Sequence, residues 1–98
     1  MASVRYANKV IDDFDRILDH LTKYQSADAM DRFTEIRAAI NILAGSPLIG
    51  RLATGEFREL VIGRGGRGYI ALYRYSEAMD RVTVVAIRAQ KESGYHRP

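Results

Sequence analysis

The residues best able to do chemistry in this sequence are cationic, and they gather near its C-terminus. Arg88, Lys91 and Tyr95 lie close together along the chain, and Arg74 lies on an earlier strand-like run. Twelve of the fifteen Lys and Arg residues are Arg, the side chain best suited to bidentate contact with phosphate or carboxylate. Residues 51–98 carry nine Lys or Arg against five Asp or Glu, whereas residues 1–50 carry six against seven. The basic tail therefore predicts a contact with an anionic target such as a nucleic acid.

Other kinds of catalytic or metal site are missing from the sequence. The absence of cysteine removes disulfides, thiolate catalysis and metal sites with sulfur ligands. His20 and His96 are the two histidines, and no carboxylate is spaced to complete a metal site with either. No serine lies in a nucleophile-elbow context, and the four aspartates within residues 12–19 are expected to form a solvated helix face. We therefore predict no metal and no cofactor.

A glycine-rich segment at residues 63–68, Gly-Arg-Gly-Gly-Arg-Gly, is similar in sequence to a phosphate-binding loop. That mechanism needs a following helix whose N-terminus meets the phosphate, and here a strand-like run follows instead. A hairpin turn that needs positive φ is the better interpretation.

Hydrophobic periodicity predicts two helices ahead of the basic half of the chain. Apolar residues three and four apart predict a helix over residues 8–24. A second stripe runs from Ala29 to Leu43, with Ser26 as a candidate N-cap and the Gly45 to Pro47 segment as the stop. Because the connection between them is short, the two helices should form an antiparallel hairpin.

Strand-like runs flank the helices. Ser3–Tyr6 alternates like a short edge strand, and three runs rich in Val, Ile, Tyr and Phe follow at residues 57–62, 69–75 and 81–87. Consecutive strands with short links make an antiparallel meander. The predicted fold class is α+β in the order β-α-α-β-β-β, with the helices on one face of the sheet.

Both faces of this predicted sheet are apolar, and two helices can cover only one of them. The other face should expose an apolar patch of the kind that marks a partner site. We expect this face to consist of four aliphatic residues, Leu60, Ile62, Ile70 and Leu72. The tail, residues 91–98, is too polar to cover them completely, so a protein partner is preferred.

Length and composition limit the class of protein. Ninety-eight residues with 47% hydrophobic and 28% charged side chains predict one folded domain over residues 1–98. No apolar run is long enough to span a membrane, and the N-terminus lacks the apolar segment of a signal peptide. A cytoplasmic location is expected.

Several stretches in order resemble the RelE/ParE superfamily of toxins from bacterial type II toxin–antitoxin modules. They are the Gly-Ser-Pro-Leu-Ile-Gly-Arg run at residues 45–51, Phe-Arg-Glu-Leu at 57–60, the Tyr69–Tyr73 strand and Arg-Ala-Gln-Lys-Glu-Ser-Gly-Tyr at 88–95. Their order is more specific than any one of them. One departure is Ala89, where many relatives carry a His. The resemblance implies a cognate antitoxin, small and with an acidic C-terminal segment, that forms a hetero-oligomer with this chain.

The superfamily has branches with different targets. Resemblance to the branch that cleaves mRNA on the ribosome implies Arg58 and Tyr95 as matching residues, but Leu60, Ile70 and Ala89 stand where basic residues would be expected. Loss of such cations should cost several kcal/mol of transition-state stabilisation, so an enzyme is the less favoured interpretation. The ParE-like branch, which poisons DNA gyrase, needs no active site of its own.

The sequence therefore predicts a ParE-like toxin of a plasmid-stabilisation module, with gyrase as target and Leu60, Ile62, Ile70 and Leu72 as the antitoxin-binding face. Target contacts are expected from Arg74, Arg88, Lys91 and Tyr95. The alternative is a RelE-like mRNA endonuclease, with ribosome and mRNA as partners, that uses Arg58, Arg74, Arg88, Lys91 and Tyr95. A further alternative is an inactive relative that acts only as a binding partner.

Overall fold

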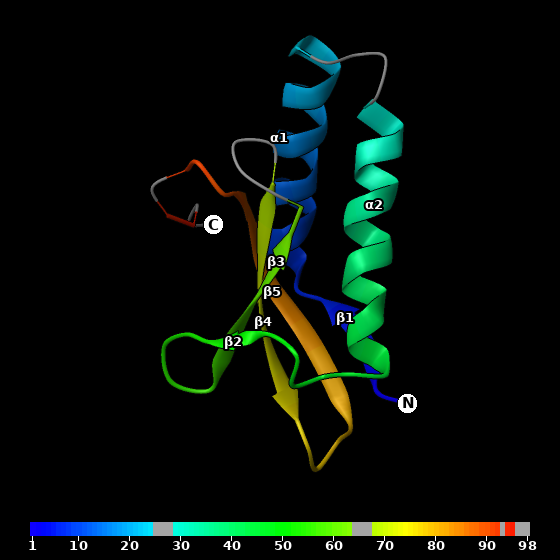
Figure 1. Cartoon of the computed structure of the whole chain (residues 1–98), viewed down its shortest axis with the longest axis vertical. Helices are drawn as coiled ribbons and strands as arrows, with labels where there is room; N and C mark the ends of the chain where they lie inside the picture. The colour runs from blue at the N-terminus through cyan, green and yellow to red at the C-terminus, as the bar shows by residue number, and fades with distance from the viewer. Residues whose placement is uncertain (25–28, 64–67, 93, 96–98) are drawn as a thin grey trace.

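Two helices pack on one face of a five-stranded mixed sheet in the computed structural model (Figure 1), which describes residues 1–24, 29–63, 68–92, 94 and 95. The elements in chain order are β1 (Ser3–Tyr6), α1 (Asn8–Tyr24), α2 (Ala29–Asn41), a 3₁₀ turn η2 (Ile42–Ala44), β2 (Arg51–Leu52), β3 (Phe57–Ile62), β4 (Tyr69–Ser76) and β5 (Arg81–Ala89). The α+β class, the helix over residues 8–24 and the three longer strands are confirmed. The candidate cap Ser26 lies outside the described residues.

The sheet has the strand order β1-β5-β4-β3-β2. β1 is an edge strand as expected, and it pairs in parallel with β5. The meander has four strands, β2 to β5, so the prediction of a three-stranded meander is incomplete. The additional strand, β2, is only two residues long, too short for its sequence to show a period of two.

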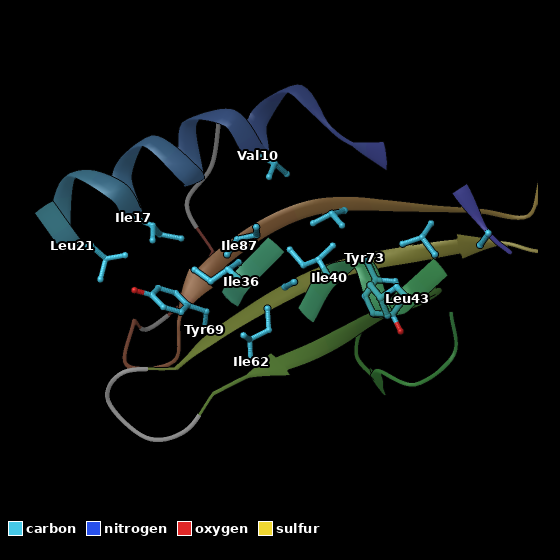
Figure 2. Close-up of a cluster of buried hydrophobic side chains, with 14 of the residues drawn as sticks. Val10, Ile17, Leu21, Ile36, Ile40, Leu43, Ile62, Tyr69, Tyr73 and Ile87 are labelled. Atoms are coloured by element: carbon cyan, nitrogen blue, oxygen red, sulfur yellow. The ribbon is translucent and has the colours of Figure 1, made fainter. Parts of the chain in front are cut away.

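The core forms where the helical stripes meet the sheet (Figure 2). Val10, Ile17 and Leu21 of α1 are almost fully buried, as are Ile36 and Ile40 of α2. Each such side chain contributes about 1.5–3 kcal/mol through burial. The two helices also meet through aromatic rings on their facing sides, since the ring of Phe14 lies edge-on to that of Phe33 with centroids 5.0 Å apart.

The 63–68 segment lies between β3 and β4, which pair antiparallel as a hairpin. Gly63 has a φ of 74°, a left-handed conformation that glycine adopts without strain. The predicted need for positive φ is therefore confirmed at this position. Residues 64–67 lie outside the described residues.

A β-bulge in β5 decides which side chains of that strand face the helices. Leu72 pairs with Ala86 and Tyr73 pairs with Val84, so Val85 is the extra residue. Val84 before the bulge and Ile87 after it are both fully buried against the helices. Without the bulge, strict alternation would turn Arg88 into the core. The extra residue instead turns Arg88 to the opposite face of the sheet, called here the second face.

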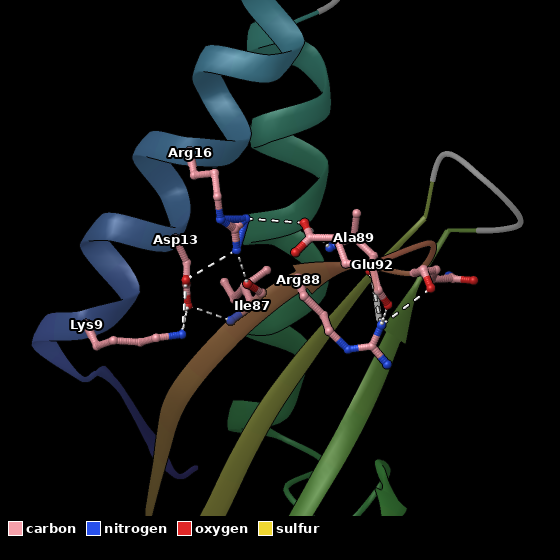
Figure 3. Close-up of polar contacts among 8 residues, drawn as sticks. Lys9, Asp13, Arg16, Ile87, Arg88, Ala89 and Glu92 are labelled. Atoms are coloured by element: carbon pink, nitrogen blue, oxygen red, sulfur yellow. Dashed lines mark hydrogen bonds and ion pairs between the residues drawn. The ribbon is translucent and has the colours of Figure 1, made fainter. Parts of the chain in front are cut away.

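The expectation that the aspartates of α1 form a solvated face is wrong for Asp13, which is only 2% exposed. Its carboxylate accepts a hydrogen bond from the backbone N–H of Ile87 at 2.9 Å, and Arg16 donates to the Ile87 carbonyl at 3.1 Å (Figure 3). β1 ends at Tyr6, opposite Val84, so no strand is available to bond this part of the edge of β5. A helix side chain and its ion-pair partner take that place.

Candidate functional site

The structure does not bring the four predicted target-binding residues, Arg74, Arg88, Lys91 and Tyr95, together in a single cluster. Arg88 and Tyr95 meet on the second face, where the guanidinium carbon of Arg88 lies 5.1 Å from the centre of the Tyr95 ring. Arg74 points to the same face but lies farther along β4. Arg88 pairs with Ile70, which is four residues, or about 13 Å, from Arg74. Lys91 is exposed and lines a cavity on the helix side of the sheet. Of the four predicted target-binding residues, two therefore form a contact.

Arg88 fixes the turn that follows β5. Its Nη1 donates to the carbonyls of Ala89 at 3.2 Å, Gln90 at 3.4 Å and Glu92 at 2.8 Å (Figure 3). Glu92 in turn accepts a hydrogen bond from the Ala89 N–H at 3.2 Å and pairs with Arg16 of α1 at 3.3 Å. The chain after β5 is thus tied both to the sheet and to a helix.

Tyr95 is held by a carboxylate, Glu59, that no pattern in the sequence marks as a site residue. Its hydroxyl donates to Glu59 Oε2 at 2.6 Å. Burial and this hydrogen bond raise the pKa of Tyr95 well above its ordinary value of 10, and the same bond lowers the pKa of Glu59. The phenol therefore stays protonated near neutral pH and acts as a donor. Glu59 pairs across the sheet with Leu72, so the two side chains lie on the same face. The predicted residues Ile70 and Leu72 thus indicated this part of the sheet, although not Glu59 itself.

Arg58 is engaged elsewhere. Its Nη1 donates to the carbonyls of Leu48 at 3.2 Å and Gly50 at 2.9 Å, in the loop before β2. Tyr73, whose side chain is fully buried, donates to the Pro47 carbonyl at 2.9 Å and accepts from the Gly50 N–H at 2.8 Å. Arg58 is therefore part of the scaffold that fixes this loop, and it is not joined to the tail.

The four residues predicted to share one exposed face lie on two faces. Leu60 pairs with Ala71 and Ile62 pairs with Tyr69, so both point toward the helices, where Ile62 is buried and Leu60 packs on the core. Ile70 and Leu72 point to the second face. The expectation that the four form one surface is wrong because the β3–β4 register, invisible in either strand alone, sets their relative orientation.

The second face is also less open than expected. Ile70 is only 5% exposed and Leu72 is half-buried. Because Tyr95 contacts β5 through Arg88 and β3 through Glu59, and β4 lies between those strands, the ring crosses β4 on this face. Tyr95 therefore covers part of the surface that the sequence predicts for a partner.

On the opposite side, a cavity of about 250 Å³ lies between the helices and the end of β5. Its lining includes Arg16, Arg32 and Lys91 around an apolar floor of Leu21 and Tyr69. Among the residues that the structure describes, this cavity included, no group of three or more His, Asp or Glu side chains is placed to hold a metal ion. Neither described helix has the length and apolar character needed to span a membrane.

The comparisons with known proteins agree with this fold. A solved structure described as the chromosomal ParDE TA system from P. aeruginosa superposes with a TM-score of 0.74, covering 91% of this chain and 96% of that chain at 20% sequence identity, which shows the same fold. No curated protein matches the sequence. A family model described as the ParE toxin of the type II toxin–antitoxin system parDE matches residues 4–94. Since that match spans almost the whole sequence, the chain belongs to the ParE toxin family of type II toxin–antitoxin systems.

Proposed function

We propose that this ParE toxin acts in the cytoplasm by binding the complex of DNA gyrase with DNA, and that a ParD-type antitoxin neutralises it. Membership of the parDE family supports the toxin class and the antitoxin partner. The target contact is assigned to Arg88 and Tyr95 on the second face, with Arg74 farther along β4 and Lys91 on the helix side of the sheet. Cationic side chains on the sheet face and just after β5 suit the phosphates of DNA held by an enzyme.

We prefer gyrase to mRNA cleavage because Tyr95 and Arg58 are both held in hydrogen bonds within the protein. A nuclease that uses the 2′-OH of its RNA substrate needs groups that take up and release a proton. Tyr95 donates a hydrogen bond to Glu59 and keeps its proton because its pKa is raised, and Arg58 donates hydrogen bonds to two loop carbonyls. Neither is arranged for proton transfer. Leu60, Ile70 and Ala89 supply no charge.

The test compares both targets with one preparation of protein. In a gyrase supercoiling assay, the purified toxin should make cleaved DNA accumulate, and it should leave mRNA on programmed ribosomes intact. Cleavage of mRNA in the ribosomal A site, with gyrase unaffected, would overturn the assignment in favour of the nuclease.

The antitoxin is proposed to contact the second face chiefly at Leu72, which is half-buried, because Ile70, the other predicted residue that points there, is already covered. Val61, which pairs with Ile70, is 45% exposed and extends this apolar surface toward β3. Truncation of an aliphatic side chain that becomes buried in an interface typically weakens binding by about tenfold or more.

Leu72→Ala should therefore weaken binding of the antitoxin encoded by the neighbouring reading frame, measured by titration calorimetry, while the circular dichroism spectrum stays unchanged. Ile11→Ala is the matched control, because Ile11 is 60% exposed on α1, away from this face. Equal affinities of the two variants would show that the antitoxin contact lies elsewhere.

A further inference from the structure

Four polar side chains form a line across the second face, and Glu59 lies at its centre. Glu59 Oε1 accepts a hydrogen bond from Arg51 Nε on β2 at 3.1 Å, and its Oε2 accepts the Tyr95 hydroxyl at 2.6 Å. Tyr95 stacks in turn on Arg88 of β5. The line Arg51–Glu59–Tyr95–Arg88 thus connects the tail to both sides of β4, and each carboxylate oxygen of Glu59 has its own donor.

The geometry favours an indirect role for Glu59. A phosphate would be repelled by a carboxylate, so Glu59 is unsuited to contact an anionic target itself. Arg51 and Arg88 lie on either side of it and leave the line with a net positive charge. The lowered pKa of Glu59 keeps it ionised near neutral pH, which strengthens the hydrogen bond that it accepts from Tyr95.

Tyr95 needs such an anchor because it lies six residues beyond the end of β5. A side chain on a segment outside the helices and strands loses conformational entropy when it binds a target, unless another contact has already ordered it. Glu59 supplies the hydrogen bond and Arg88 the stacking surface, so the phenol and the guanidinium are fixed side by side before any target arrives.

We propose that Glu59 is a positioning residue that holds Tyr95 against Arg88 and so assembles the surface through which this toxin engages its target. This inference rests on the proposed function for the nature of that target. It assigns a role to a carboxylate, whereas the charge pattern of the sequence directs attention only to cations.

The test uses Glu59→Ala, Tyr95→Phe and the double variant, with Glu77→Ala as the control because Glu77 is an exposed carboxylate in the β4–β5 turn. Half-maximal growth inhibition on titrated expression should need about tenfold more Glu59→Ala than wild-type protein. Tyr95→Phe should add little in the Glu59→Ala background, since both changes break the same contact. Glu59→Gln, which keeps an acceptor, should retain part of the potency.

A second readout follows the phenol directly. NMR of protein with ¹³C-labelled tyrosine rings should show Tyr95 titrating far above the ordinary tyrosine range, and Glu59→Ala should move it back toward that range. Wild-type potency in Glu59→Ala, or additive effects in the double variant, would overturn the positioning role. Failure of the wild-type protein to affect gyrase, with growth inhibition still dependent on Glu59, would instead overturn only the proposed target.

Discussion

Asp13 illustrates how one side chain can complete a sheet edge. Its carboxylate takes the hydrogen bond of the Ile87 N–H, while Arg16 bonds the Ile87 carbonyl, as a neighbouring strand would. Lys9 approaches the same carboxylate at 2.9 Å, so the buried charge has two cationic partners. An uncapped edge would leave a buried backbone donor unsatisfied, which costs about 1–3 kcal/mol.

Asp13→Ala should therefore lower the free energy of unfolding by about 3 kcal/mol, because it removes both the acceptor of the Ile87 N–H and the carboxylate that Lys9 and Arg16 share. Asp13→Asn keeps an acceptor and should cost less. Urea unfolding followed by circular dichroism measures both. Asp12→Ala is the matched control, since Asp12 is exposed one residue away. A loss no larger than that of the control would refute the edge-capping role.

At the scale of elements, the loop before β2 is fixed by contacts from strands farther along the chain. The Tyr73 hydroxyl and the Arg58 guanidinium together bond three carbonyls and one N–H of residues 47–50. This brings the backbone of Gly50 so close that an added Cβ would lie 2.6 Å from the Tyr73 hydroxyl and 2.9 Å from the Glu59 carbonyl. Glycine is required here by proximity.

Gly50→Ala should destabilise the protein by about 1–3 kcal/mol, because the buried Tyr73 ring and the β3 backbone have no room to move aside. Gly45→Ala is the control: its added Cβ would meet only the end of the Met1 side chain, at 3.9 Å. Thermal unfolding of the two variants side by side decides the point. Similar melting temperatures would mean that the loop can shift to accept a Cβ.

Periodicity within one element was enough to predict α1 and the three longer strands, because each buries a repeating stripe of its own. Relations between elements were not predictable in the same way. The bulge at Val85 changes the facing of β5 partway along, and the β3–β4 register turns Leu60 and Ile62 toward the helices. The bulge and the register both depend on hydrogen bonds between strands, and the hydropathy pattern of a single strand does not predict those bonds.

At the scale of the whole molecule, the candidate site is made by segments that meet only after folding. The side-chain chemistry of Arg88 and Tyr95 was enough to predict them as site residues. Their separation from Lys91, on the other face of the sheet, and from Arg74, farther along β4, is set by the folded sheet. The sequence pattern did not indicate Glu59, and it placed Asp13 on a solvated helix face, because carboxylates in an amphipathic sequence are usually solvated. Their partners lie 36 and 74 residues away along the chain.

The contact between Tyr95 and Glu59 should also make stability depend on pH, with opposite signs on the two sides of neutrality. The raised pKa of Tyr95 means that its contribution is complete below its unfolded value of about 10 and is lost as the pH rises through the folded pKa. The lowered pKa of Glu59 means that its contribution is present above about 4.5 and is lost as the pH falls through the folded value.

Tyr95→Phe should accordingly make the fall in the free energy of unfolding above pH 10 shallower, by less than the limit of about 1.4 kcal/mol per pH unit for one proton, since the partly exposed ring is screened by solvent. Part of the slope should remain, because burial also raises the pKa of Tyr73. Tyr75→Phe provides the comparison: its phenol bonds Asp80 at 2.7 Å in an exposed setting, so it should change the slope less. Urea unfolding at a series of alkaline pH values measures all three proteins. If the Tyr95→Phe slope equals that of the wild type, the tail is not held to Glu59 in solution, and the line of side chains across the second face does not form.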